Sequence, residues 1–248
     1  MMAFTIAGRE FRTLFLSPLA WSILGVIQII LAFMFLVQLD YYMELQARIA
    51  GMPDAPGVTD LVVAPVFGNA GVILLFVTPL LTMRLISEER RNRTLSLLFT
   101  APVSMAEIIL GKYLGILGLL FTLIAMLTLM PLSLFLGGTL DPGKLAACVL
   151  ALALLLASLA AIGLYISALA TQPTVAGIST FGVSLLLWII NWTDRGAGGV
   201  LEYLSLLRHY ESLLKGLVST TDLAYFLLFI LTFLVLSVHR LDNDRLQK

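Results

Sequence analysis

The most concentrated group of reactive side chains in the sequence is a run of charged residues at positions 84–93. Ser104 follows it as the start of a new helix, with Glu107 three residues later, which is the pattern of a capping box. Two interpretations are open from these residues alone. The run is either a short charged helix that lies along a membrane and binds another protein, or a set of charges that only fixes the topology of a neighbouring span.

Residue spacings typical of enzymes and metal sites are absent from the sequence. The two histidines, His209 and His239, are 30 residues apart, and Cys148 is the single cysteine. Gly111-Lys112 resembles part of a phosphate-binding loop, but Tyr113 stands where that loop needs Ser or Thr. We therefore expect a non-catalytic chain that binds no metal or cofactor itself, and an intramembrane enzyme is disfavoured.

Composition assigns the chain to the membrane proteins. Of its 248 residues, 60% are hydrophobic and 12% are charged, whereas soluble domains average about 45–50% and about 25%. Fifteen Lys and Arg balance fifteen Asp and Glu, which excludes a strongly basic nucleic-acid binder. The apolar residues form long uncharged blocks, and a barrel would need segments of about ten residues with alternating polarity. The expected fold class is all-α, a polytopic membrane protein.

Six membrane spans follow from the lengths of the uncharged blocks, because a helix needs about 20 residues to cross the hydrocarbon. The longest block, residues 145–193, holds two spans, and Pro173 marks the break between them. The first block is too long for a signal peptide and is expected to stay as an anchor. We predict one transmembrane domain over residues 1–248, with spans at about 17–39, 66–86, 110–136, 144–170, 174–193 and 222–239.

The distribution of basic residues predicts the orientation. Six spans put both termini on one side, together with ten Lys and Arg, while five lie on the other side. The positive-inside rule then places both termini in the cytoplasm. We expect a multi-pass protein of a bacterial cytoplasmic, or inner, membrane, with a formal charge of +4 inside and −4 outside.

Two amphipathic segments lie outside the spans. Residues 3–16 have apolar side chains at spacings of three and four, which predicts a helix in the membrane interface unless the segment simply extends the first span. Residues 202–219 form a second stripe that either rests on the outer leaflet or re-enters the membrane. The residues assigned to the N-terminal interface helix are Phe4, Arg9, Phe11, Arg12 and Phe15.

Ionisable groups are nearly absent from the predicted spans, which disfavours an ion- or proton-coupled secondary transporter. Polar residues there either line a path or form hydrogen bonds between helices. A stripe of Gly111, Gly115 and Gly118 favours close approach of another helix to the third span. The polar candidates are Gln28, Gln38, Ser184 and Asn191.

Residues 83–115 resemble the signature region of ABC-2 type transporter permeases. The match is carried by Arg84, Glu88-Glu89-Arg90, Thr94, Leu97-Leu98, Thr100-Ala101-Pro102-Val103-Ser104 and Gly111-Lys112-Tyr113. The family pattern commonly has Gly at the position of Arg93. Two further stretches are similar to the gliding-motility-associated subgroup of these permeases, namely Arg9-Glu10-Phe11 with Ser17-Pro18-Leu19-Ala20, and Arg208-His209-Tyr210-Glu211-Ser212 with Gly216-Leu217-Val218.

The resemblance implies a permease subunit of an exporter that moves substrate by alternating access, with a second copy of itself or a related permease as partner. A separate ATP-binding subunit would hold ATP and Mg, and periplasmic accessory subunits are possible partners. The helix from about residue 88 to 100 would be the coupling helix that contacts that subunit. Its implied contact residues are Glu88, Glu89, Arg90, Arg91, Arg93, Thr94, Leu97, Leu98, Phe99, Ala101 and Pro102.

One alternative function stays open from the sequence. An ABC-2-like chain can instead serve as a membrane anchor or mechanical subunit of an envelope or motility complex that transports no solute.

Overall fold

The computed structural model describes residues 2–49, 57–94, 103–136, 140–193 and 205–246. Within these residues every element is helical, which confirms the all-α fold class. The helices are α1 (Met2–Leu16), α2 (Pro18–Ile49), α3 (Ala64–Thr82), α4 (Ser87–Arg91), α6 (Met105–Ser133), α7 (Pro142–Leu169), α8 (Pro173–Thr193), α10 (Leu206–Leu214) and α11 (Thr220–Leu246), with a π-helical turn at Thr59–Val63 and a 3-10 turn at Leu134–Leu136.

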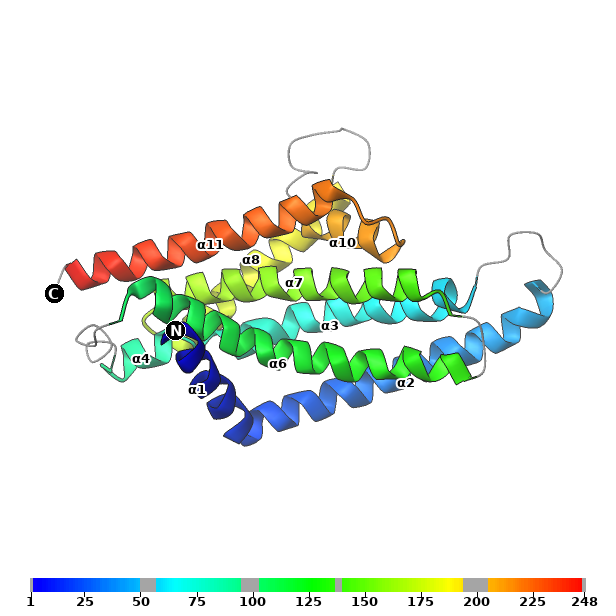
Figure 1. Ribbon diagram of the computed structural model, residues 1–248, viewed down its shortest axis with the longest axis horizontal. Coiled ribbons are helices and arrows are strands. Elements are labelled where there is room, and N and C mark those ends of the chain that lie inside the picture. The colour runs from blue at the N-terminus through cyan, green and yellow to red at the C-terminus, as the bar shows by residue number, and fades with distance from the viewer. Residues whose placement is uncertain (1, 50–56, 95–102, 137–139, 194–204, 247–248) are drawn as a thin grey trace.

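Six of these helices are long and apolar enough to cross a membrane, as predicted: α2, α3 with its flanking turns, α6, α7, α8 and α11. They run roughly side by side, and the two chain termini lie at the same end of the bundle (Figure 1). We call this end the terminal end. The α4 helix and the start of α6 also lie there, while α10 lies toward the opposite end (Figure 1).

The predicted breaks between helices are confirmed. The bend at Ser17 separates α1 from α2, and α8 starts at Pro173 after α7 has ended at Leu169. Ser104 caps α6 in a complete capping box with Glu107. The first and last spans are longer than predicted, because α2 continues to Ile49 and α11 to Leu246. Both extensions carry charged residues, so a rule that ends a span at its first charge cuts these helices short.

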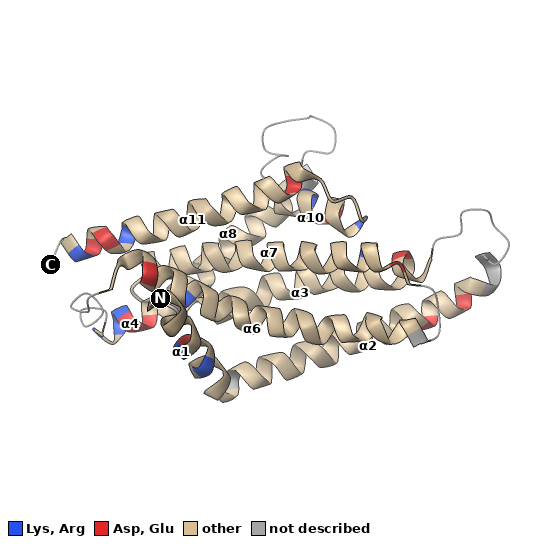
Figure 2. Ribbon diagram, in the orientation of Figure 1, with Lys and Arg blue, Asp and Glu red and all other residues tan. Residues whose placement is uncertain are grey.

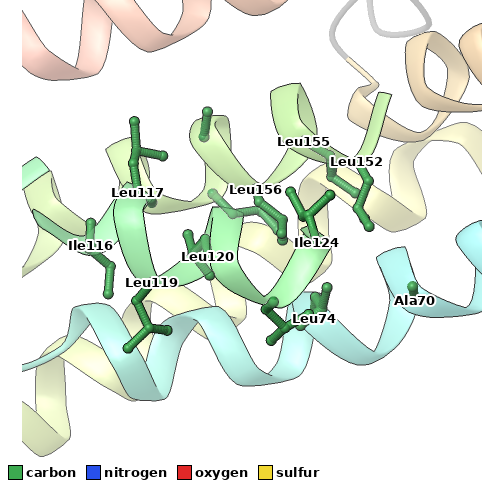
Figure 3. Packing of buried hydrophobic residues seen from close by; sticks show 14 of the residues in the cluster. Ala70, Leu74, Ile116, Leu117, Leu119, Leu120, Ile124, Leu152, Leu155 and Leu156 are labelled. Carbon is green, nitrogen blue, oxygen red and sulfur yellow. The ribbon is translucent and has the colours of Figure 1, made fainter. Parts of the chain in front are cut away.

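The α7 helix forms the centre of the bundle. In its most apolar window 72% of the residues are buried, compared with 22% for α8 and for α11. Leucines of α7 interdigitate with α6 and α3, and Figure 3 shows Leu152, Leu155 and Leu156 next to Leu120 and Ile124. The more exposed helices surround this core and turn apolar side chains outward, as expected for a protein whose surroundings are lipid.

Charged side chains are confined to the two ends of the bundle (Figure 2). The middle of the six long helices shows no charged residue in this view (Figure 2). This agrees with the high cost of placing charged side chains in hydrocarbon. Groups that can form ionic contacts are therefore found where the helices end, and those at the terminal end surround α4.

Candidate functional site

The α4 helix is a single short turn of charged residues held at the terminal end. Glu88 and Glu89 lie in its first turn and Arg90 and Arg91 in its last. This order suits the helix dipole, because carboxylates are favoured at a helix N-terminus and cations at its C-terminus. The central four charges of the run at residues 84–93 therefore lie in a short helix of their own, separate from α3.

The end of α4 is a Schellman motif. The Thr94 N–H donates to the Glu89 carbonyl at 3.0 Å, and the Arg93 N–H donates to the Arg90 carbonyl at 3.2 Å. The motif needs a left-handed residue, and Arg93 takes that place with φ of 57°. Glycine is favoured there because it has no Cβ. The family pattern, with Gly at this position, thus describes a backbone bend that this chain makes with arginine.

The start of α4 is fixed by Ser167 of α7. Its hydroxyl oxygen accepts from the Ile86 N–H at 3.0 Å and from the Ser87 N–H at 3.1 Å. The same hydroxyl donates to the Met83 carbonyl at 3.0 Å. Ser167 is fully buried, and its hydroxyl satisfies backbone groups of the junction between the end of α3 and the start of α4.

A buried ion pair network joins α4 to α6 and α1. The Lys112 ammonium lies 2.7 Å from a Glu89 carboxylate oxygen and 3.1 Å from a Glu10 carboxylate oxygen. The Lys112 side chain is only 3% exposed, and a buried cation is tolerated when it is paired in this way. Arg9 lies 3.6 Å from Glu10. The four formal charges of this network sum to zero.

A second contact joins α4 to the end of α11. Arg90 forms an ion pair with Asp244 and donates to the Ala168 carbonyl of α7 at 2.7 Å. Arg240 lies 3.4 Å from the other carboxylate oxygen of Asp244. The extension of α11 beyond the predicted span therefore places an acidic partner beside α4. We call Glu10, Lys112, Ser167 and Asp244 together the α4 anchor.

The predicted contact residues of α4 divide into two groups. Glu89 and Arg90 turn toward the bundle and bind the α4 anchor, whereas Glu88, Arg91, Arg93 and Thr94 are exposed. Residues three apart lie on one face of a helix, so Glu88 and Arg91 share the outward face. The remaining predicted contacts, Leu97, Leu98, Phe99, Ala101 and Pro102, lie outside the residues that the structure describes.

The N-terminal helix α1 packs across α6 at the glycine stripe. A Cβ added at Gly111 would lie 2.6 Å from Ile6, and one at Gly115 would lie 2.7 Å from Glu10. The expected close approach of a helix to this stripe is therefore present, and the helix is α1. Its aromatic residues are partly exposed: Phe4 and Phe11 are 75% and 37% exposed, and Phe15 lies 4.6 Å from Phe11 between ring centroids. Arg9 and Arg12 are exposed, and the position of α1 in the membrane interface stays a prediction.

At the opposite end, α10 packs into the bundle through its apolar face. Tyr210 is 1% exposed, and its hydroxyl donates to the Phe67 carbonyl at 2.6 Å. A Cβ at Gly71 would lie 2.8 Å from the Tyr210 ring, so glycine makes room for it. Burial raises the pKa of the Tyr210 hydroxyl well above its usual value, which keeps it protonated as a donor. His209 and Asp222 lie 2.6 Å apart and join α10 to α11.

The comparison with family models adds the decisive observation. Residues 49–191 match the model described as ABC-2 family transporter protein. This chain belongs to that family. The matched range contains α4, Lys112 and Ser167 and most of the six spans. The comparison with curated proteins gave no match. The resemblance to the gliding-motility subgroup stays a prediction.

The predicted polar path residues of this ABC-2 permease take different places. Gln28 donates to the Met126 carbonyl at 3.2 Å and so joins α2 to α6. Ser184 is fully buried within the bundle, and Gln38 is half-buried on α2. Asn191 lies in the last turn of α8, and its side chain lies outside the described residues. Gln28 thus acts in helix packing.

Three residues of the α4 anchor were not predicted from the sequence to bind α4. Lys112 was noted for its place in Gly111-Lys112-Tyr113 and as a basic residue beside a span, Ser167 as one of many small polar residues, and Asp244 as a terminal charge. One signal was available for Lys112. It lies three residues before Gly115 of the glycine stripe, and residues three apart share a helix face, so a helix that approaches the stripe at Gly115 also passes the lysine.

Proposed function

We propose that this permease is the transmembrane subunit of an ABC exporter and works with a separate ATP-binding subunit that holds ATP and Mg. The contact would be made by the outward residues of α4 and the segment that follows it. The observation that supports this best is the division of α4. Its inward charges are bound within the chain, and its outward charges are left on the surface at the terminal end.

The anchor explains how a force on α4 would reach the spans. Glu89 joins α4 to α6 and α1, Arg90 joins it to α7 and α11, and Ser167 fixes its start. Movement of a bound ATPase would therefore act on four helices at once. Rigid-body rotation of packed helices is a common way to switch between two states, and here it would give alternating access.

The same proposal includes an orientation in the membrane and a second copy of the permease as partner. The terminal end would face the cytoplasm of a bacterial cell, because the ATP-binding subunit needs cytoplasmic ATP and because basic residues gather at that end. A second copy of this permease would complete the transporter. The membrane-anchor function predicts the same contacts but no transport cycle.

The test is charge reversal on the outward face of α4. Tagged permease is purified from its own cells in mild detergent, and the ATPase activity retained on it is measured. We expect the double variant E88K/R91E to lose most of this activity, while the matched variant R12E, an exposed charge of α1 at the same end, retains it.

Full retention of ATPase activity by E88K/R91E would contradict the proposed contact. If the contact holds, reconstituted vesicles separate the two functions. ATP hydrolysis that a transported substrate stimulates supports the exporter, and hydrolysis that no added solute changes supports the anchor.

A further inference from the structure

The last helix of the bundle is longer than a membrane requires. The α11 helix has 27 residues, which gives a length of about 40 Å, whereas the hydrocarbon of a bilayer is about 30 Å thick. Its residues 223–238 carry no charge. In Figure 1 its C-terminal end lies beyond the ends of the neighbouring helices. Residues 239–246, which we call the α11 tip, therefore lie outside the hydrocarbon at the terminal end.

The inward face of the α11 tip is bound to the rest of the chain. Leu241 is fully buried, and Asp244 forms an ion pair with Arg90 of α4. Arg240 lies 3.4 Å from the other oxygen of the same carboxylate. Helix ends usually fray, because a short helical stretch is only marginally stable in water. These contacts hold the α11 tip beside α4, so that its other side chains point in a defined direction.

The outward face of the α11 tip consists of His239, Asp242, Asn243 and Leu246, which are all exposed. Their spacings of three and four residues place them on one side of the helix. Leu246 is 84% exposed, and among the residues that the structure describes Asp242 has no ion pair. An exposed leucine beside an unpaired carboxylate suits a protein contact, because such interfaces combine an apolar centre with a polar rim.

Three kinds of surface can cover this face, and its charge distinguishes them. An anionic leaflet attracts Lys and Arg, whereas this face has Asp242 and no Lys or Arg. A second copy in a two-fold contact would bring the same patch of both chains together, and with it two like charges. A soluble subunit at the terminal end meets neither objection. It would reach α4 as well, because the ion pair between Arg90 and Asp244 places the α11 tip beside α4.

We propose that the α11 tip is a second docking surface for the ATP-binding subunit, separate from the outward residues of α4. Leu246 enters an apolar socket of that subunit, and Asp242 binds a Lys or Arg at the rim of the socket. This rests on the proposed function, since it requires such a subunit. Because Asp244 joins the α11 tip to α4, the subunit would hold two elements that move together.

The test measures the binding of purified ATP-binding subunit to the full-length permease in lipid nanodiscs. We expect D242A/L246S to bind about tenfold more weakly, the effect of losing one apolar anchor. The matched variant D40A/L217S removes an exposed aspartate and an exposed leucine near the opposite end, and should bind as the wild type does. The loss in D242A alone should shrink as salt is added, whereas the loss in L246S should persist.

A photo-crosslinking residue, p-benzoylphenylalanine in place of Asn243, identifies what covers the face and leaves both contact residues present. We expect an adduct with the ATP-binding subunit. An adduct with lipid or with a second permease copy would overturn the proposal, and so would wild-type affinity of D242A/L246S. If that variant binds normally while E88K/R91E binds weakly, the α11 tip is wrong and the proposed function stands. If the wild-type permease binds no ATP-binding subunit, both are wrong.

Discussion

The two ends of the bundle hold their short helices by different forces. At the terminal end, α4 is bound through ion pairs and charge-assisted hydrogen bonds to Lys112, Asp244 and the Ala168 carbonyl. At the opposite end, α10 is held mainly by apolar packing, with the Tyr210 ring against Gly71. Long charged side chains can exchange partners between discrete arrangements, whereas a packed ring leaves a cavity when it moves.

This difference suggests where a conformational cycle starts. Coupling between distant sites needs elements with two discrete arrangements, and the ion pairs around α4 can be rearranged without opening a cavity. The α10 end is better suited to stay fixed while the other end moves. Variants at the two ends therefore test the comparison, because they should separate loss of ATPase binding from loss of stability.

The largest effect is expected from K112M. Removal of the lysine leaves the Glu10 and Glu89 carboxylates partly buried without their cation, and breaking a buried pair costs about 3–5 kcal/mol. The free energy of unfolding is measured by denaturant titration in detergent. The matched variant K144M removes the ion pair with Asp60, whose side chain is 45% exposed, and should cost about 1 kcal/mol or less.

A rescue variant shows whether charge is the cause. E10Q/K112M/E89Q removes all three charges and should recover most of the loss, because no unpaired carboxylate is left. If K112M and K144M lowered the free energy of unfolding equally, the proposed difference between the two ends would be contradicted. K112M should also lower the ATPase activity retained on the permease, since α4 loses its contact with α6.

The second prediction concerns the opposite end. Y210F keeps the ring against Gly71 but removes the hydrogen bond that the Tyr210 hydroxyl donates to the Phe67 carbonyl, which should cost about 0.5–1.5 kcal/mol. Y165F is the matched control, because Tyr165 has only a ring contact with Phe233 among the described residues. Unlike K112M, Y210F should leave ATPase retention unchanged. A loss of the ATPase at unchanged stability would contradict a fixed α10 end.

The third prediction tests the contact between α4 and α11. D244N keeps the shape of the side chain but removes the charge that Arg90 and Arg240 share. We expect a loss of about 1 kcal/mol, because Arg90 retains the Ala168 carbonyl and the site is partly exposed. D242N, an exposed aspartate on the same stretch of helix, should have no measurable effect. Equal thermal stability of both variants would show that Asp244 adds nothing to the anchor.

The fold was predictable where one property decides it. Uncharged length set the six spans, and proline set the breaks at Pro18 and Pro173. The α4 anchor was harder to predict from the sequence, because its four residues come from four distant segments and none of them is unusual on its own. Lys112 beside a span reads as a topology signal. Only the approach of α1 to the glycine stripe places Glu10 beside it.

The smallest effect is expected at the C-terminus of α4. Arg93 has a left-handed backbone, which costs a residue with a Cβ about 1 kcal/mol relative to glycine. R93G should therefore be more stable than R93A by up to about 1 kcal/mol, with R93N between them. All three variants remove the same charge, so their order reports backbone conformation alone. R91G is the opposite control, since glycine inside α4 should destabilise it by about 1 kcal/mol. If R93A is as stable as R93G by thermal unfolding, the left-handed turn contributes no strain, and the end of α4 depends only on the contacts of Glu89 and Arg90 with the α4 anchor.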